Sequence, residues 1–572
     1  MHPVTPSTGS SSDAHSHDSH TDAQGRTIYR CGSLVYTKMG LVALFGWLLW
    51  GDFCFTLMEA VVPSILPLKL RSLESSNWLI GAIMSTLPGI FNTTVCPWVS
   101  FKSDRYRSNW GRRLPFILYT MPFLTLSLIL IGCSDSIGAW LHSLCFQGGS
   151  VRQAAVVITL LAVFAGAFDL FNMFVGSVYW YLFNDVVPEK FLARFMSYFR
   201  LVGVVSSAGF NFFIFKYAES HMREIYLGAA LLYFIGFGIM CMKVKERQYP
   251  PPPDAGQEPS LMRDIKTFAK ESYSISYYWN IFLNTVFTAV AGCMGPFVVF
   301  FYRSLDLDLD LIGKFNAING VLVAACLTFV GGFVDRWHPV RVVAYLTPFG
   351  FVLTLNYCVW LFVGTPPPML IFWALAVFCV SHCLLSAAQQ AASLPREMEL
   401  FPRDRFGQFC GAQALVRSGA TMIGGVAAGL FIDFAKEIFP NGLYPYRFIY
   451  IWQTVFLVVA FVFHYRAYRV WKRLGADDGY VPPTKRFSVN ELLARPPEPS
   501  KDGFVHAGVN LRLAWFGVIG ILGLVVFNLI FAGYFVFFAK QSRDALVFGI
   551  QIAVNIALIP LYLKLLRFME RP

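Results

Sequence analysis

Three carboxylates stand within stretches of the chain that are otherwise apolar. Asp52 and Glu59 are seven residues apart in one stretch, and Asp169 lies in the middle of another. A spacing of seven is two helical turns, so the first two would share one helix face. A charge in lipid costs about 3 kcal/mol on insertion scales, so ionisable residues in a membrane helix mark functional positions. Such carboxylates could take up a proton, bind the hydroxyl groups of a polar solute, or do both.

Uncharged polar and aromatic side chains in other apolar stretches complete the candidate binding set. Amides bond hydroxyl groups, and an indole or phenol ring stacks on the apolar face of a sugar, as Trp47 and Tyr179 also could. The predicted substrate- and proton-binding residues are Asp52, Glu59 and Asp169 together with Trp50, Asn172, Asn280, Asn284, His382, Gln389 and Gln390. Polar side chains also bond neighbouring membrane helices together, and for the Asn and Gln residues both interpretations stay open.

The elements that must position these residues are membrane-spanning helices. Of the 572 residues, 56% are hydrophobic and 14% are charged, whereas soluble domains carry about 25% charged residues. A spanning helix needs roughly 20 apolar residues, and the chain contains fourteen apolar stretches of suitable length. The sequence predicts an all-α polytopic membrane protein, because an open sheet could not satisfy its backbone in lipid.

The spans fall into two sets of six and a final pair. The predicted domains are a disordered cytoplasmic tail (1–38), a six-helix bundle (39–243), a cytoplasmic connector (244–276), a second six-helix bundle (277–466), a cytoplasmic linker (467–510) and two additional transmembrane helices (511–572). With the N-terminus in the cytoplasm, about three quarters of the 46 lysines and arginines lie on that side, as the positive-inside rule requires. The net charge of +12 therefore favours cytoplasmic loops over nucleic-acid binding.

Neither a metal centre nor an enzyme active site is expected. Cys379, His382 and Cys383 form the short pattern "CVSHC", but no second ligand pair accompanies it, so a thiol-lined helix face is the better interpretation. The HExxH, GxSxG and Walker patterns are absent from the sequence, which argues against a membrane enzyme. We expect no catalytic residue and no cofactor, and the expected coupling ion is H⁺. Gly425 and Gly429, at GxxxG spacing, predict close helix packing.

Charged motifs recur at matching places in the two halves. "SDRYRSNWGRR" (103–113) follows the second span, and "VDRWHPVRV" (334–342) follows the eighth. "NDVVPEKFLARF" (184–195) follows the fourth span, and "MELFPRDRFGQF" (398–409) follows the tenth. Shared positions in both halves indicate an internal duplication.

These motifs in a chain of six plus six helices resemble the major facilitator superfamily. The resemblance covers about 39–466 and implies that the charged loops form a cytoplasmic gate whose ion pairs hold one state shut. It assigns to that gate Asp104, Arg105, Arg112 and Arg113 in one half and Asp335 and Arg336 in the other. Arg200 and Arg417, at the starts of spans five and eleven, are assigned to the gate as well. The alternative is that these charges only set topology.

A narrower resemblance concerns the solute. "SDRYRSNWGRRLPFI" is similar to the loop of plant sucrose transporters, their animal relatives and the glycoside–pentoside–hexuronide cation symporters. This resemblance implies that the solute is a sugar or glycoside. Together with the intramembrane carboxylates and the charge bias, it leads us to expect proton-coupled symport in the plasma (cell inner) membrane, with both termini cytoplasmic. Asn92 and Cys96 stand where the sodium-coupled members carry acids, which disfavours sodium. The alternative is an uncoupled facilitator or exporter of another small solute on the same fold.

Overall fold

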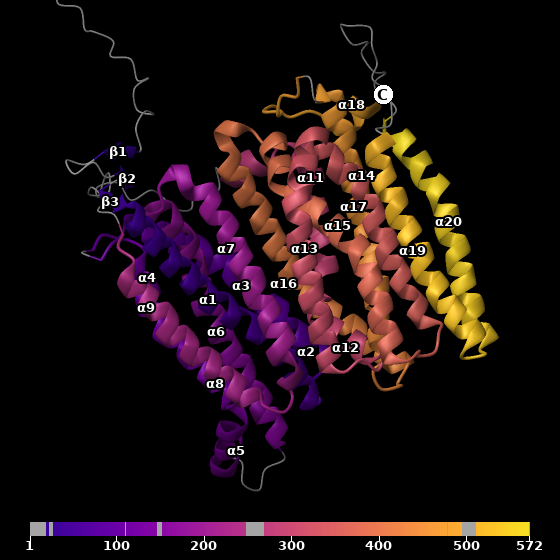
Figure 1. Ribbon diagram of the computed structural model, residues 1–572, viewed down its shortest axis with the longest axis horizontal. Coiled ribbons are helices and arrows are strands. Elements are labelled where there is room, and N and C mark those ends of the chain that lie inside the picture. The colour runs from indigo at the N-terminus through magenta and orange to yellow at the C-terminus, as the bar shows by residue number, and fades with distance from the viewer. Residues whose placement is uncertain are drawn as a thin grey trace, which may run out of the picture.

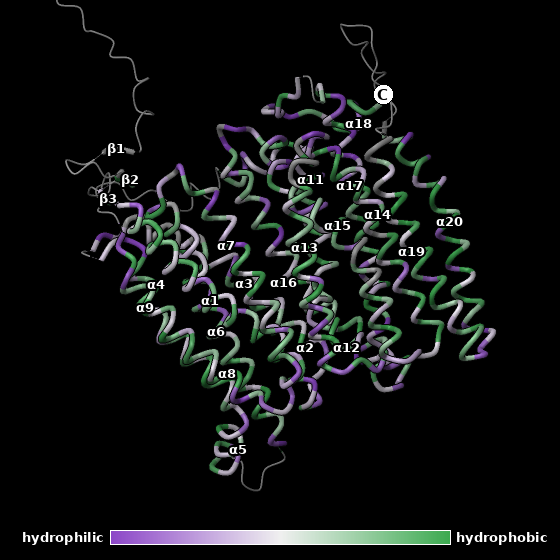
Figure 2. Tube along the Cα trace, in the orientation of Figure 1, coloured by the Kyte–Doolittle hydropathy of each residue, from purple (hydrophilic) through white to green (hydrophobic). Residues whose placement is uncertain are grey.

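The computed structural model describes residues 19–21, 27–31, 33–108, 110–145, 151–246, 268–476, 479–494 and 511–570. The chain forms two neighbouring helical bundles, with two further helices beside the second bundle (Figure 1). The tube coloured by hydropathy is predominantly green along the long helices, and polar residues gather toward their ends (Figure 2).

The N-terminal bundle is built from six membrane-crossing units. These are α1 (Lys38–Ser72), α2 (Asn77–Gly81) with α3 (Leu87–Arg105), α4 (Leu114–Gly132), α6 (Gln153–Val186), α7 (Glu189–Gly209), and α8 (Met222–Leu232) with α9 (Gly238–Lys243). Short α5 (Ser134–Cys145) lies between α4 and α6. The turn Ala82–Thr86 joins α2 to α3 as a π-helical segment, and Phe210–Ile214 extends α7 in the same way. Thr37 caps α1, since its hydroxyl accepts a hydrogen bond from the backbone N–H of Gly40.

The C-terminal bundle repeats this pattern. Its units are α11 (Ser276–Gly292) with α12 (Val298–Arg303), α13 (Leu309–Trp337), α14 (Pro339–Tyr357), α15 (Pro368–Leu400), α16 (Phe406–Ile438) and α17 (Ile449–Arg473). Short α18 (Val489–Ala494) follows in the linker, and α19 (Leu511–Phe537) and α20 (Ser542–Glu570) end the described chain. Pro339 and Pro368 stand at the first helical positions, where a missing N–H costs nothing.

Thirteen helical stretches in the described part of the chain are long and apolar enough to cross a membrane. The tenth predicted span, about 369–393, coincides with α15, a helix of 33 residues. The prediction of a helical polytopic membrane protein is confirmed for the membrane-spanning part, and the arrangement of six plus six plus two stays a prediction.

The prediction of a disordered tail over 1–38 is wrong for its final part. Three strands, β1 (Ser19–Thr21), β2 (Thr27–Cys31) and β3 (Leu34–Thr37), form an antiparallel sheet in the order β1-β2-β3. The segments "TIYRC" and "LVYT" are rich in β-branched and aromatic residues, which favour strands. Tyr29 packs edge-on against Phe191 at the start of α7, with ring centroids 5.0 Å apart, so the sheet gains apolar contact with the bundle.

A buried amide cluster attaches the two additional helices to the C-terminal bundle. Asn528 on α19 and Asn555 on α20 both donate to the side-chain oxygen of Asn356 on α14, at 3.0 and 2.8 Å. Trp360 packs edge-on against Phe531 and Phe548, with ring centroids 5.1 and 5.9 Å apart. Asparagine pairs hold membrane helices together, so α19 and α20 belong structurally to the second bundle.

Both ends of the described chain lie at the same end of the molecule, the upper end in Figure 1. We call this end the terminal face and the other end the opposite face. The predicted topology makes the terminal face cytoplasmic.

Candidate functional site

Three adjoining cavities lie between and within the two bundles. The central cavity has a volume of about 1300 Å³ and is lined by α3 and α6 of the first bundle and by helices of the second. An N-terminal cavity of about 490 Å³ shares Met84 and Pro88 with it. A junction cavity of about 470 Å³ shares Asn319, His382 and Gln390 with the central cavity. A solute in this system would touch both halves of the chain.

The predicted carboxylates gather at these cavities. Glu59 on α1 lines both the N-terminal and the junction cavities, Asp169 on α6 lines the first, and Asp52 lines the second. Asn172 on α6 donates to a Glu59 carboxylate oxygen at 3.0 Å. Thr56 donates to one oxygen of Asp52 at 3.3 Å, while the other, buried oxygen has no hydrogen-bond partner among the described residues. Protonation of Asp52 would remove the free-energy cost of burying a negative charge of which only one oxygen accepts a hydrogen bond.

The structure brings most of the other predicted binding residues into the central cavity. Asn284, His382, Gln389 and Gln390 line it, and the side-chain amide of Gln390 donates to Ser386 at 3.0 Å. Their placement gives the cavity the hydrogen-bonding groups that a polyhydroxylated solute needs.

Two predicted binding residues lie away from the three cavities. Asn280 is buried within α11 and donates to the carbonyl oxygens of Ser276 and Tyr277, both at 3.2 Å. Trp50 is exposed on α1 and stacks on Phe53, with ring centroids 5.8 Å apart. The bonding within α11 favours a packing role for Asn280, as the alternative interpretation of intramembrane amides allowed.

Arg200 and Arg417, predicted to stand at the starts of spans five and eleven, line cavities and are not among the described contacts of the charged network at the terminal face. Arg200 on α7 lines the junction cavity beside Asp52 and Glu59. Arg417 on α16 lines the central cavity. Sequence position alone placed them at helix starts, but each stands more than ten residues into a helix that begins earlier than predicted.

Sequence reasoning missed a polar cluster on the terminal-face side of the central cavity. Arg396 and Glu397 near the end of α15 form an ion pair at 3.7 Å. Gln413 on α16 donates to Glu397 at 3.1 Å and to Thr285 on α11 at 2.8 Å. The charged residues are visible in "PREMEL", but the apolar pattern ends near residue 393 and so predicts the end of the helix there, whereas α15 continues to Leu400.

Aromatic residues outside the predicted binding set line the central cavity in the second bundle. Tyr302, Tyr357 and Tyr450 all contribute to its wall. The rings of Tyr357 and Tyr450 are nearly parallel, at 11°, with centroids 4.2 Å apart. These tyrosines, rather than Trp50, supply aromatic surface to the cavity.

The two bundles are joined on the side of the opposite face. Asp433 on α16 accepts hydrogen bonds from the backbone N–H groups of Asn77 and Trp78 at 3.0 and 2.8 Å, so it caps the first turn of α2. Tyr446 donates to the side-chain oxygen of Asn77 at 2.6 Å. Nearer the middle of the helices, Asn92 on α3 donates to Ser418 on α16 at 3.2 Å. These contacts hold the two bundles together between the central cavity and the opposite face.

Glycines allow this close approach. A Cβ atom at Gly425 would lie 2.6 Å from the carbonyl oxygen of Gly81, and one at Gly429 would collide with the backbone of Asn77 and Trp78. The predicted GxxxG packing site is therefore confirmed, and it lies at the contact between α16 and α2. This contact is formed by backbone atoms that cannot move aside as a side chain can.

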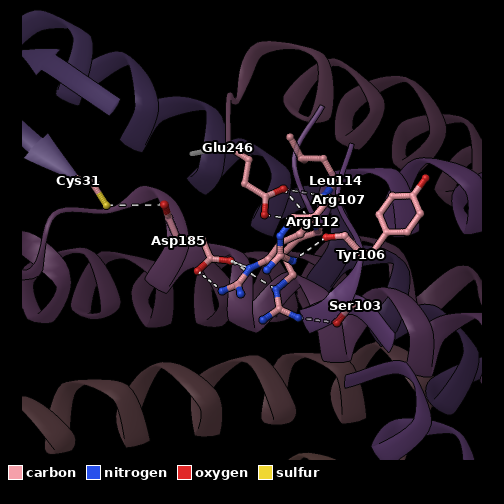
Figure 3. A network of polar contacts seen from close by, with 9 residues as sticks. Cys31, Ser103, Tyr106, Arg107, Arg112, Leu114, Asp185 and Glu246 are labelled. Carbon is pink, nitrogen blue, oxygen red and sulfur yellow. Dashed lines mark hydrogen bonds and ion pairs between the residues drawn. The ribbon is translucent and has the colours of Figure 1, made fainter. Parts of the chain in front are cut away.

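At the terminal face, Arg112 and Asp185 belong to a charged network within the first bundle (Figure 3), and Arg113 also pairs with Asp185. Asp185 at the end of α6 accepts two hydrogen bonds from Arg112, at 2.9 and 2.7 Å, and one from Arg113 at 3.4 Å. Arg113 also donates to Ser103. Two parallel N–H···O bonds make the Arg112–Asp185 pair strong and geometrically specific.

Glu246, just beyond α9, completes this network. Its carboxylate accepts hydrogen bonds from the backbone N–H groups of Arg113, at 2.8 Å, and Leu114, at 3.2 Å. Burial raises the pKa of Glu246 above its ordinary value, although these backbone bonds oppose the shift. Sequence analysis missed both acids, because Asp185 and Glu246 are distant in sequence from the loop that they hold.

Other predicted gate residues are not part of the described network. The side chains of Asp104, Arg105 and Asp335 lie outside the part of the chain that the structure describes. Arg336 is exposed near the end of α13. The participation of these four residues in a gate stays a prediction.

Replacing Asp185 by Ala is expected to destabilise the protein by about 3–5 kcal/mol, because it removes the buried carboxylate to which both Arg112 and Arg113 bind. Thermal unfolding of the purified protein in detergent would measure the loss. Asp135→Asn provides the control, since the side chain of Asp135 is 61% exposed in its ion pair with Lys69, and an exposed ion pair contributes about 0–1 kcal/mol. Equal losses in the two variants would contradict a structural role for the network.

Comparison with protein-family models decides the class of this two-bundle chain. The model described as "MFS/sugar transport protein" matches residues 50–467, which includes both bundles and all three cavities. The chain belongs to the MFS/sugar transport protein family. It is therefore an integral multi-pass membrane protein with the family and fold of transporters rather than enzymes.

Curated relatives of this family member match over shorter segments. It is 24% identical over 241 residues to solute carrier family 45 member 4 of Mus musculus, covering 40% of this chain and 29% of that protein. It is 30% identical over 158 residues to the sucrose transport protein SUC3 of Arabidopsis thaliana, covering 26% of this chain and 24% of that protein. The chain thus spans 29% and 24% of the lengths of these two relatives.

Solved structures share the fold of this MFS/sugar transport protein family member. A bacterial homologue of the human lysosomal transporter Spinster, in an inward-facing and unoccupied conformation, aligns with a TM-score of 0.57 and 13% identity, covering 78% of this chain and 100% of that one. A bacterial homologue of the iron transporter ferroportin, in an inward-facing state, aligns with a TM-score of 0.53 and 15% identity, covering 75% and 99%. At these identities the likeness concerns the fold alone.

Proposed function

We propose that this protein moves a sugar or glycoside across the plasma membrane by alternating access, in symport with protons and with both termini in the cytoplasm. The observation that carries the proposal is the placement of Asp52, Glu59 and Asp169 at cavities between and within the two bundles. Carboxylates in that position can exchange a proton with the solute pathway without facing lipid. The name of one relative, a sucrose transport protein, supports the choice of a sugar.

The described contacts support a cycle of rocking bundles. With the terminal face in the cytoplasm, the structure is an inward-facing state, because the Asn77–Asp433 contact closes the outer side. In the outward-facing state this contact opens, and the solute and a proton enter from outside. Protonation neutralises a carboxylate in the cavity, the bundles rock, and both ligands leave into the cytoplasm.

Uptake of radiolabelled glycosides, sucrose and maltose included, into proteoliposomes tests the substrate class. We expect uptake of at least one glycoside that exceeds equilibration when the outside is more acidic than the inside. Uptake that equilibrates and ignores the proton gradient would indicate an uncoupled facilitator. Failure of every sugar in liposomes whose protein is correctly folded would overturn the assignment of a sugar substrate.

A further inference from the structure

Two thiols converge on one acceptor in the wall of the central cavity. Cys379 and Cys383 lie one turn apart on α15, and their Sγ atoms are 3.3 Å apart. Both Sγ atoms also lie within hydrogen-bonding distance of the side-chain oxygen of Asn319 on α13, at 3.0 and 3.2 Å. One oxygen from the neighbouring helix α13 holds both thiols on the same side of α15. The two sulfur atoms therefore lie close together before any ligand binds.

Access to this pair runs through the cavity. Cys379 and Asn319 line the central cavity. The side chains of Cys379 and Cys383 are almost fully buried. The described residues contain no group of three or more His, Cys, Asp or Glu side chains that could hold a metal ion. A ligand that suits the pair must therefore be small and must need only two sulfur atoms.

The geometry distinguishes among ligands for two thiols. A disulfide requires Cβ atoms about 3.5–4.5 Å apart, whereas residues four apart on a helix have Cβ atoms about 5–6 Å apart, so oxidation would distort α15. A two-coordinate metal ion holds its thiolates on opposite sides of itself. A trivalent arsenic centre is pyramidal and binds two neighbouring sulfur atoms on one side, as Cys379 and Cys383 present them.

We propose that Cys379 and Cys383 form a dithiol site that binds trivalent arsenic compounds from within the central cavity. Phenylarsine oxide is the probe. Two S–H bonds and the arsenic–oxygen double bond break, two As–S bonds form, and the oxygen leaves with both thiol protons as water. Arsenic stays trivalent and nothing is oxidised. The phenyl group of the adduct projects into the cavity and blocks solute passage.

Intact-mass measurement of the purified full-length protein after treatment with phenylarsine oxide tests the proposal. We expect a phenylarsenic adduct with loss of water that survives a monothiol wash and is removed by 2,3-dimercaptopropanol. Cys379→Ser and Cys383→Ser should each lose this adduct. Cys410→Ser should retain it, because Cys410 also lines the central cavity but has no thiol hydrogen-bonded to it in the described contacts.

Peptide mapping of the wild-type protein makes the test independent of variant folding. Prior treatment with the arsenical should protect both Cys379 and Cys383 from alkylation after unfolding. Alkylation of both residues despite the arsenical, or a dithiol-reversible adduct that persists in a variant carrying both Cys379→Ser and Cys383→Ser, would overturn the proposal. These mass readouts require no transported solute, so their outcome is separate from that of the proposed sugar transport. In liposomes that take up a solute, inhibition by the arsenical should disappear in Cys379→Ser.

Discussion

Replacing Glu59 by Gln is expected to abolish gradient-driven accumulation of solute while leaving the protein folded. Glu59 lines two of the three cavities and accepts a hydrogen bond from Asn172. Gln keeps the size of the side chain and the acceptor oxygen for Asn172, but it cannot bind or release a proton. The bundles of the variant can still exchange between states, so solute should equilibrate without exceeding the external concentration.

Uptake with and without an inward proton gradient would measure this effect. The control is Glu74→Gln, which also removes a carboxylate but at an exposed position where Glu74 pairs with Arg152. The control should accumulate solute as the wild type does. Undiminished accumulation by Glu59→Gln would exclude Glu59 as the coupling residue and direct attention to Asp52 and Asp169.

Replacing Gly429 by Val is expected to displace the conformational equilibrium away from the described state. The added carbon atoms would collide with the backbone of Asn77 and Trp78, and the collision is relieved when the bundles separate at the opposite face. Overpacking of this kind costs about 1–3 kcal/mol, which corresponds to a shift of about 5- to 150-fold in the equilibrium between two states. The outward-facing state should then dominate. Transport should fall because the change from the outward-facing to the inward-facing state becomes slow.

Labelling of a single cysteine introduced at Thr86 would report this shift, because Thr86 donates to the carbonyl oxygen of Met422 across the closed contact. An impermeant maleimide applied from outside should react faster in Gly429→Val. Gly419→Val is the matched control on the same helix, since a Cβ atom there meets nothing within 4 Å. Equal labelling rates in the two variants would show that the glycine contact does not limit opening.

The sequence was most informative where lipid imposes strong constraints. Apolar length predicted the membrane helices, and the cost of intramembrane charge selected Asp52, Glu59 and Asp169, all three of which line cavities. The spacing of Gly425 and Gly429 predicted a close contact that the structure contains. Each of these inferences depends on local composition and helical periodicity, which a single chain displays directly.

Pairing between distant segments could not be derived in this way. Asp185 and Glu246 hold the Arg112–Arg113 loop, and Asp433 caps α2 from the other bundle, but helix hydropathy does not specify which acid meets which donor. Helix ends in water were also misplaced, since polar residues such as Arg396 and Glu397 continue α15 beyond its apolar part. Trp50 and Asn280 were chosen by residue type, which does not say whether a helix face meets a cavity, a neighbouring helix or lipid.

The most direct test of proton symport measures proton movement driven by the solute alone. Proteoliposomes loaded with a pH-sensitive dye and held at equal pH on both sides would receive an external glycoside that the uptake panel has identified. The proposed mechanism predicts that the lumen becomes acidic as the glycoside enters, and that Glu59→Gln shows entry without acidification. Entry of the glycoside into wild-type liposomes without any change in luminal pH would contradict proton coupling.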